Sequence, residues 1–168
     1  MTQLQLFKAE ERKPDGLHYW SDFISPEEEG ELTDRFSPLA LVPFQFGAFE
    51  GKRRVASFGW KYDYGAQRIA RAAEIPEWVR PIIARVEQAA ALRDTVEQLL
   101  FTEYTPGAGI GWHRDKKAFG TVCGLSLASA CPFRFRRKSA SKWERYTFRC
   151  DRRFPVQHER QGALSVGT

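Results

Sequence analysis

The chain has 168 residues, of which 42% are apolar, 28% charged and 14% aromatic, and this composition excludes a disordered protein and favours a sheet-rich core. The length suits a single domain spanning residues 1–168 and excludes two domains of ordinary size. The net charge of +5 is compatible with a polyanionic partner such as nucleic acid.

The sequence carries no signal for export or for a membrane. No eighteen apolar residues follow one another, and the first residues lack the apolar run of a signal peptide. The cysteines Cys123, Cys131 and Cys150 are odd in number and lack CxxC spacing, which argues against a disulfide framework or a zinc site. We therefore expect a cytoplasmic, monomeric protein with reduced thiols and no membrane contact.

Two helices are predicted in the first half of the chain. In "SPEEEGELTDRF", Ser25 suits an N-cap, Pro26 suits the first helical position, and Glu28 stands three residues after the cap. A second helix is predicted from Pro76 to about Ala91, with Pro81 bending its first turn. Its expected apolar face comprises Trp78, Ile82, Val86 and Ala89.

Strands are predicted in the second half. The alternation in "VEQLLFTEY" predicts a strand with Thr102 and Tyr104 on one side. "IGWHRD" is read as extended, and "TVCGLSLA", "PFRFRR" and "KWERYTFRC" as further strands, the last two forming a hairpin through "KSAS". In "PFRFRR" the phenylalanines are expected to point inward and Arg134 and Arg136 outward. This order of elements predicts an α+β protein whose sheet curls into a sandwich or barrel.

The octapeptide "GIGWHRDK" places His113 and Asp115 two residues apart on an extended segment. Side chains at that spacing point to the same side of the chain, so both can reach one metal ion. With a second, distant histidine they would form the two-His-one-carboxylate triad, which leaves positions open on Fe(II) for a cosubstrate and O2. Taken alone, the pair is more simply explained by a surface histidine beside a solvated aspartate.

The surrounding sequence, "FTEYTPGAGIGWHRDKKAFGTVCGLSLA", resembles the core of the AlkB-like family of Fe(II)/2-oxoglutarate dioxygenases. The positions that match are Tyr104, Pro106, Gly107, Ile110, His113, Asp115, Phe119, Leu125, Ser126 and Leu127. Upstream, "RRVASFGWKYDYG" and "GLHYWSDFISPEEEGEL" are also similar to segments of the family, so the resemblance covers about residues 16–149. It implies a double-stranded β-helix, or jelly-roll, with N-terminal helices.

The resemblance implies roles for individual residues and names the cofactors as Fe(II), 2-oxoglutarate and O2. His113 and Asp115 would be catalytic metal ligands, and the Tyr104 hydroxyl would donate to a 2-oxoglutarate carboxylate. Thr102 stands where the family usually has asparagine, which offers more hydrogen bonds, so its contact with the cosubstrate is open. An ordinary core tyrosine is the alternative for Tyr104.

The substrate side is expected in "RRVASFGWKYDYG". Trp60, Tyr62 and Tyr64 alternate and could stack on an unpaired base, while Arg53 and Arg54 could hold phosphate. The alternative is that the rings belong to the core and the arginines are solvated. The implied activity is oxidative demethylation or dealkylation of alkylated nucleic-acid bases, as in DNA repair. An inactive or non-catalytic basic nucleic-acid-binding module, or a hydroxylase or demethylase of proteins, are the alternatives.

The sequence departs from the family after "YTFRCD". The segments expected to carry the third metal ligand and the arginine that binds the cosubstrate do not follow, and His158 lacks the flanking Trp and Gly, so it is not expected to be the third ligand. One permitted codon set for residues 156–168, read one nucleotide later, encodes YSMSGRARSAWE and then a codon that a pyrimidine completes as histidine. We therefore predict an out-of-register tail over residues 152–168, a fold truncated at its C-terminal strands, and an inactive chain. The nucleotide sequence tests this prediction.

Overall fold

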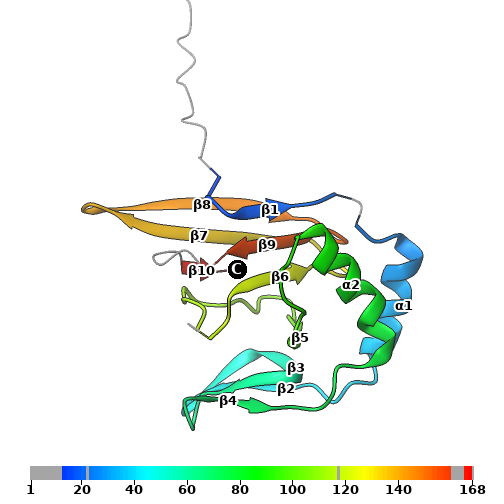
Figure 1. Cartoon of the computed structure of the whole chain (residues 1–168). Coiled ribbons are helices and arrows are strands. Elements are labelled where there is room, and N and C mark those ends of the chain that lie inside the picture. Colours follow the sequence, from blue (N-terminus) through cyan, green and yellow to red (C-terminus); the bar gives the residue numbers. More distant parts are fainter. Residues whose placement is uncertain (1–12, 22, 117, 160–164, 168) are drawn as a thin grey trace, which may run out of the picture.

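A computed structural model of the chain describes residues 13–21, 23–116, 118–159 and 165–167 (Figure 1). The predicted α+β class is confirmed, since two α-helices and one 3-10 turn accompany the strands. In chain order the elements are β1 (Leu17–Tyr19), α1 (Pro26–Phe36), β2 (Val42–Phe46), β3 (Phe49–Asp63), β4 (Arg68–Arg71), η1 (Glu77–Val79), α2 (Arg80–Ala89), β5 (Gln98–Glu103), β6 (Thr121–Leu125), β7 (Cys131–Ser139), β8 (Lys142–Cys150), β9 (Pro155–Glu159) and β10 (Ser165–Gly167).

Helix α1 begins where the sequence predicts. The Ser25 hydroxyl oxygen accepts from the Glu28 backbone N–H at 3.2 Å, and the Ser25 N–H donates to the Glu28 carboxylate at 2.9 Å, which completes a capping box. Pro26 occupies the first turn, where a missing N–H removes no helical hydrogen bond. The helix buries Leu32 and, unexpectedly, Glu29.

Glu29 ties α1 to two distant loops. Its carboxylate accepts from the Ala128 backbone N–H at 2.8 Å and from the Arg152 guanidinium at 2.5 and 3.0 Å. The Arg152 hydrogen bonds hold the pKa of the Glu29 carboxyl below its usual range, against a smaller opposing effect of burial. This interaction fixes the turn that leads into β9.

The second predicted helix is confirmed in position, and its predicted apolar face is confirmed in part. A 3-10 turn, η1, precedes α2, and Pro81 lies in the first turn of α2. Trp78 and Ile82 pack against a core cluster as expected, but Val79 and Ile83 are the buried members of that cluster and Ala89 is exposed. A 3-10 turn advances 120° per residue instead of 100°, so the contact is rotated relative to that of a continuous α-helix.

One layer of the fold is built around the long strand β3. Its first half pairs with β2 on one side and β5 on the other, and its second half pairs with β4. The change of partner occurs at Gly59, which has φ +74° and whose N–H donates to the Ala73 carbonyl. A Cβ at Gly59 would collide with the Glu97 carbonyl oxygen, so this crossing requires glycine.

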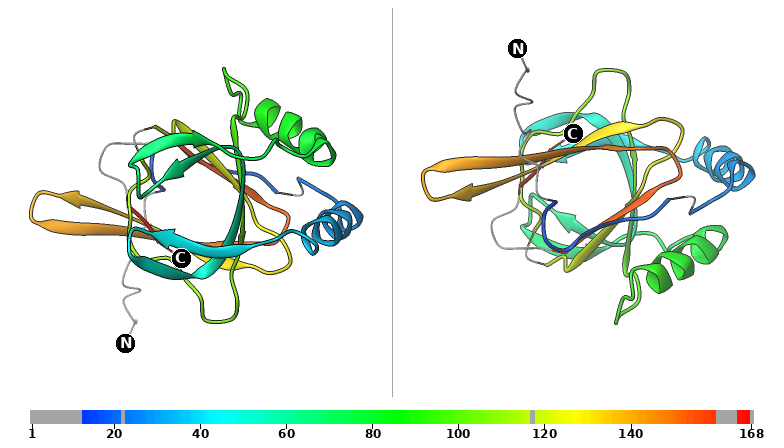
Figure 2. Two further views of the ribbon diagram at one scale, coloured as in Figure 1. Left: turned by 90° about the horizontal axis from the view of Figure 1, so that it is seen from below. Right: turned by 90° about the horizontal axis from the view of Figure 1, so that it is seen from above.

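The other layer contains the strands β1, β9 and β6 and the strands β10, β7 and β8, each in that order. Figure 1 shows this layer above β2, β3 and β4, with both helices at one end. In Figure 2 the predicted β7–β8 hairpin projects from the opposite end. The core beneath this layer comprises Leu17, Phe135, Cys150 and Val156, with Tyr19, Phe133 and Phe148 packed against it.

The C-terminal part of the chain takes part in the fold as far as the structure describes it. Residues 155–159 form the central strand between β1 and β6, and residues 165–167 pair with β7. Residues 160–164 and 168, where part of the predicted out-of-register tail and its shifted histidine codon fall, lie outside the described residues. The predicted frame change and truncation stay predictions. Within the described ranges, neither helix has the length and apolar character needed to cross a bilayer.

Candidate active site

Asp115 lies between two histidines that come from distant parts of the chain. The Nε2 atom of His113 is 3.6 Å from Oδ1 of Asp115, and the Nε2 atom of His158 is 3.5 Å from Oδ2 of the same carboxylate. His113 and Asp115 belong to the segment between β5 and β6, whereas His158 lies on β9. Two imidazoles and one carboxylate therefore converge, as the spacing of His113 and Asp115 predicts for two of the three.

The local backbone orients the His113 ring. Its Nδ1 atom is 3.0 Å from the Gly111 carbonyl oxygen, which can only accept, so Nδ1 carries a proton in this contact. This is the type of supporting hydrogen bond that fixes the tautomer of a metal-binding histidine. The hydrogen bond to Asp115 raises the pKa of His113, and burial opposes this increase.

His158 is positioned by strand pairing. Its Cα partners are Leu17 on β1 and Val122 on β6, and its ring packs edge-on against Phe135 with the centroids 5.8 Å apart. The side chain is 7% exposed, and this burial lowers its pKa, so the imidazole is held neutral. His158 was not expected to be the third ligand, because it lacks the flanking Trp and Gly, yet the pairing of β9 with β1 and β6 brings it beside Asp115.

The donor set fits ferrous iron chemically. Two neutral imidazoles and one ionised carboxylate are the donors that Fe(II) takes in oxygenases with open coordination positions. Across the residues that the structure describes, no three His, Cys, Asp or Glu side chains already enclose a metal-sized point. The two histidines instead contact different oxygens of Asp115, so the three side chains adjoin one another.

The structure separates the two arginines that the sequence groups together. Neighbouring residues on a strand point to opposite faces. The Nη1 atom of Arg53 donates to the Tyr104 hydroxyl at 3.5 Å, whereas Arg54 forms an ion pair with Glu103 at 2.5 Å on the exposed face. Only Arg53 therefore faces the predicted cosubstrate residue.

Tyr104 follows the last residue of β5 and is 43% exposed, so it is not a buried core tyrosine. Burial of its hydroxyl end nevertheless raises its pKa, while Arg53 lowers it. Thr102 lies within β5, partly buried, with Val55 of β3 as its Cα partner. Thr102 thus lies on the strand that borders β3, and Tyr104 lies directly after its end.

An aromatic rim links β3 to the metal-binding candidates. The rings of Tyr62 and Tyr64 meet edge-on with centroids 4.9 Å apart, and the Lys116 ammonium lies 4.8 Å from the first and 5.3 Å from the second. Because Lys116 directly follows Asp115, these rings border the predicted site. Burial raises the pKa of Tyr64, with Asp115 adding to the increase and Arg53 opposing it.

Trp60 does not join this rim. Its face is covered by the Arg71 guanidinium, 3.9 Å from the ring centroid, and the side chain is only partly exposed. Phe44 and Phe46 of β2 contact Tyr64 instead, and Arg53 stacks over Phe44 at 4.0 Å. The sequence missed these two phenylalanines, because nothing in their spacing links β2 to the end of β3.

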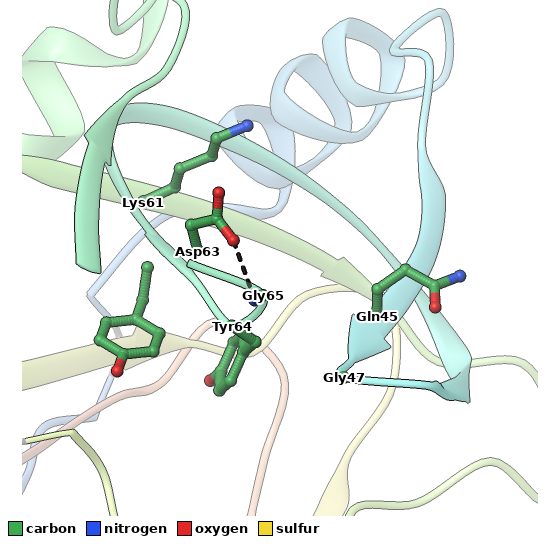
Figure 3. A pocket seen from close by; sticks show the side chains of 7 residues that line it. Gln45, Gly47, Lys61, Asp63, Tyr64 and Gly65 are labelled. Carbon is green, nitrogen blue, oxygen red and sulfur yellow. Dashed lines mark hydrogen bonds between the residues drawn. The ribbon is translucent and has the colours of Figure 1, made fainter. Parts of the chain in front are cut away.

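A hollow of about 270 Å³ opens beside the rim at the β3–β4 turn (Figure 3). Lys61 and Asp63 project from one side of β3 and Tyr64 from the other. Asp63 shapes the turn by accepting from the backbone N–H groups of Gly65 and Ala66, each at 2.9 Å. The hollow is lined by Gln45, Gly47, Lys61, Tyr62, Asp63, Tyr64 and Gly65.

Trp112 is a second feature that sequence reasoning missed. Arg134 and Arg136 lie over its ring at 5.2 and 4.6 Å, and Arg136 also lies 4.6 Å from the Trp143 ring. The expectation that these arginines simply face solvent was therefore incomplete, although Phe135 is buried as predicted. Cation–π contacts of this kind hold Trp112, and with it the neighbouring His113, against β7.

The sequence profile of the 2OG-Fe(II) oxygenase superfamily matches residues 16–161, which includes both histidines and Asp115. The chain belongs to this superfamily. Within it the chain is AlkB-like, as the resemblance of the core segment implies. A 2OG-Fe(II) oxygenase uses ferrous iron and 2-oxoglutarate, so the predicted cofactors agree with the family.

Two curated relatives and one solved structure illustrate the similarity. The alkylated DNA repair protein ALKBH8 homolog of Arabidopsis thaliana is 33% identical over 144 residues, covering 79% of this oxygenase and 39% of the relative. The mouse tRNA (carboxymethyluridine(34)-5-O)-methyltransferase ALKBH8 is 29% identical over 133 residues, covering 75% and 20%. The chain thus spans less than half the length of these relatives. The structure of OsALKBH1 matches with a TM-score of 0.73 over 93% of this chain and 85% of that one, at 14% identity, which shows a shared double-stranded β-helix fold.

Proposed function

We propose that this oxygenase removes alkyl groups oxidatively from nucleic-acid bases. The observation that carries the proposal is the convergence of His113 and His158 on Asp115 inside the region matched by the superfamily profile. Bound Fe(II), with 2-oxoglutarate and O2, would supply the oxidation of a substrate C–H bond. For an N-alkyl group, hydroxylation yields an unstable product that releases an aldehyde and restores the base.

His113, Asp115 and His158 are proposed to hold the iron. In a neutral His113 ring the proton held by the Gly111 carbonyl leaves Nε2 as the metal-binding atom, and burial favours neutral His158. A bound metal would displace the proton that Asp115 favours on His113. The carboxylate supplies the single negative charge of the set. Each side chain thus has a separate physical reason to serve as a ligand.

Arg53 and Tyr104 are proposed to bind a carboxylate of 2-oxoglutarate. A guanidinium and a phenolic hydroxyl that already contact each other can both donate to one anionic group. This assignment moves Arg53 from the phosphate role predicted for it, while Arg54, paired with Glu103, keeps an exposed position from which it could approach phosphate. Thr102 is proposed only as a neighbour of the cosubstrate.

The rim formed by Tyr62, Tyr64 and Lys116 is proposed to receive the substrate base. Unpaired bases stack on aromatic rings irrespective of sequence, and a nearby ammonium attracts the phosphate backbone. Trp60 contributes less to this surface than predicted, because Arg71 covers its face. The names of the Arabidopsis and mouse relatives associate those proteins with alkylated DNA and with tRNA, which supports a nucleic-acid substrate here.

Metal binding and turnover can be tested separately. Metal binding is measured by titrating the purified chain with Mn²⁺, which replaces Fe(II) without redox chemistry. Turnover is measured as succinate and formaldehyde released from a mixture of the protein, Fe(II), 2-oxoglutarate and methylated single-stranded DNA or RNA. His113→Ala and His158→Ala should each weaken Mn²⁺ binding and abolish succinate formation. His18→Ala is the matched control, since His18 is exposed on β1 and pairs with Gln157.

The outcomes distinguish the alternatives. Wild-type Mn²⁺ affinity in His158→Ala would contradict the proposed third ligand and favour the predicted frame change, with the ligand encoded in the shifted frame. Oligonucleotide binding without iron-dependent succinate formation would indicate a non-catalytic binding module. Succinate formation that only a protein substrate stimulates would indicate a protein hydroxylase or demethylase.

A further inference from the structure

Two thiols face each other at the base of the β7–β8 hairpin. Cys131 is the first residue of β7, Cys150 is the last residue of β8, and the register pairs them directly. Opposed residues of an antiparallel pair have Cα atoms about 4.5–5.5 Å apart, which falls within the range of about 4.4–6.8 Å that a disulfide requires. Both cysteines are free, so the backbone already brings two reduced thiols into bonding position.

The surroundings of the two thiols differ. Cys150 is buried in the core with Leu17, Phe135 and Val156, and its Sγ atom lies 3.8 Å from the Phe154 carbonyl oxygen. Cys131 is partly exposed and lines a hollow of about 310 Å³. A small oxidant that enters this hollow therefore meets Cys131, whereas Cys150 is buried in the core.

The pKa values of the two thiols differ in the same direction as their exposure, with the lower pKa at the more exposed Cys131. A hydrogen bond from the Cys150 thiol lowers the pKa of Cys131, although burial opposes this effect, and the same interaction raises the pKa of Cys150. Cys123 differs from both, because burial raises its pKa to about 11 and its Cα partner on β9 is Gln157. Since the thiolate is the nucleophile, the lowered pKa and the partial exposure of Cys131 favour it as the attacking thiol.

We propose that Cys131 and Cys150 form a reversible redox modification site that hydrogen peroxide oxidises to a cross-strand disulfide. The Cys131 thiolate attacks one peroxide oxygen and the O–O bond breaks, which gives a sulfenic acid and, after protonation, one water. The Cys150 thiol then attacks the Cys131 sulfur, the S–O bond breaks, and a second water leaves. Two thiols and one peroxide thus become one disulfide and two waters, with two electrons passing from sulfur to oxygen.

The proposed disulfide lies at the end of the hairpin where the chain leaves β8. It would join the two strands at the point where the chain turns through Arg152 toward β9. It would form by thiol chemistry alone, so it does not rest on the proposed function. The register of the hairpin pairs the two residues directly, and neither is a proposed metal ligand.

Thiol counting and peptide mapping of the full chain test the site. The native protein is treated with a small excess of hydrogen peroxide, free thiols are counted in denaturant, and the tryptic digest is analysed without reduction. The count should fall from three to one, with a loss of two hydrogen masses, and dithiothreitol should restore three. Trypsin leaves Cys123 and Cys131 on one peptide, residues 118–134, and Cys150 on residues 150–152, so Cys123→Ser is needed to assign the partner.

In the Cys123→Ser variant the same linked peptides should form and no free thiol should remain. In Cys150→Ser, Cys131 should accumulate as a sulfenic acid that dimedone traps, whereas in Cys131→Ser the Cys150 thiol should stay reduced. The wild-type count decides the matter even if a core variant fails to fold. Three thiols remaining after peroxide, a bond that includes Cys123, or bonds only between two chains would overturn the proposal.

Discussion

Aromatic and basic residues lie close together in two regions, strand β7 and the surroundings of the β2–β3 turn, but the aromatic rings are packed into the core in the first and partly exposed in the second. In β7 the alternation buries Phe135, which is 1% exposed, and leaves the intervening arginines stacked on tryptophan. Around the β2–β3 turn, Phe46 and Phe49 are 54% and 68% exposed, and Tyr62 and Tyr64 gather beside Lys116. Leu17 of β1 and Phe148 of β8 pack with Phe135 in the core, whereas among the described residues no buried hydrophobic cluster includes the β2–β3 turn. An alternating pattern therefore identifies a face, and only the neighbouring elements decide whether that face becomes core or a binding rim.

The largest expected difference between the two regions lies in stability. Phe135→Ala should lower the free energy of unfolding by about 3–5 kcal/mol, because it empties a fully packed position. Phe49→Ala should change it by less than about 0.5 kcal/mol, because the ring is mostly in water. Urea unfolding of both variants measures the contrast. Equal losses would show that the rim is covered in solution.

Charged contacts provide the second contrast. Glu29→Gln should remove about 2 kcal/mol of stability at neutral pH, since charge-assisted hydrogen bonds from Arg152 and Ala128 are lost. The wild-type contribution is present above pH 4.5 and disappears as the pH falls through the lower folded pKa, so the variant should show a flatter acid dependence.

Glu103→Gln is the control for that experiment. Its pKa is lowered by Arg54 in the same direction, but the pair is exposed and screened by water, so little stability should change with pH. Chemical denaturation between pH 7 and 3 measures both variants. A Glu103→Gln effect as large as that of Glu29→Gln would contradict the ranking of the two sites.

Nucleic-acid binding should distinguish the rim from the β7–β8 hairpin. Tyr62→Ala is expected to weaken binding of a single-stranded oligonucleotide about tenfold, because one stacked base is lost. Trp143→Ala is the matched variant on the hairpin, where the ring is 45% exposed, and should leave affinity unchanged. Fluorescence anisotropy at fixed salt measures both. A larger loss in Trp143→Ala would move the interface from the rim to the hairpin.

The smallest expected effect concerns the arginine between two tryptophans. Arg136→Met should lower the free energy of unfolding by about 0.5–1 kcal/mol through lost cation–π contacts with Trp112 and Trp143. Arg145→Met, at the exposed position paired with Arg136 across the hairpin, should have no measurable effect. Urea unfolding again provides the measurement, and indistinguishable variants would show that these contacts contribute nothing to stability.

Local signals explain what the sequence could predict. The Ser25 cap placed α1, and the alternating residues around "KSAS" placed the β7–β8 hairpin, because both depend on neighbours along the chain. The proximity of His113 and Asp115 likewise follows from their spacing. The double-stranded β-helix was inferred from resemblance to a family, not from the pattern of apolar residues.

Contacts between residues distant in the chain explain what the sequence could not predict. His158 reaches Asp115 because β9 inserts between β1 and β6, and no feature of "VQHER" encodes those partners. Arg53 and Arg54 have different partners because they lie on opposite faces of β3. The pairing of β3 with β5 brings Tyr104 to Arg53 on one face and Glu103 to Arg54 on the other. Val79 and Ile83 join Trp78 and Ile82 at the core contact of α2 because an unforeseen 3-10 turn precedes the helix.

The pairing of β1 with β9 also has a consequence for synthesis on the ribosome. Leu17 and His158 are register partners, so the sheet that carries His158 brings together segments made at very different times during translation. A nascent chain can form the β2–β3 and β3–β5 pairings early, while the sheet that seats His158 must wait until β9 has emerged from the exit tunnel. Until then the edges of β1 and β6 that pair with β9 stay unpaired, and a chaperone that shields them from aggregation would act during this interval.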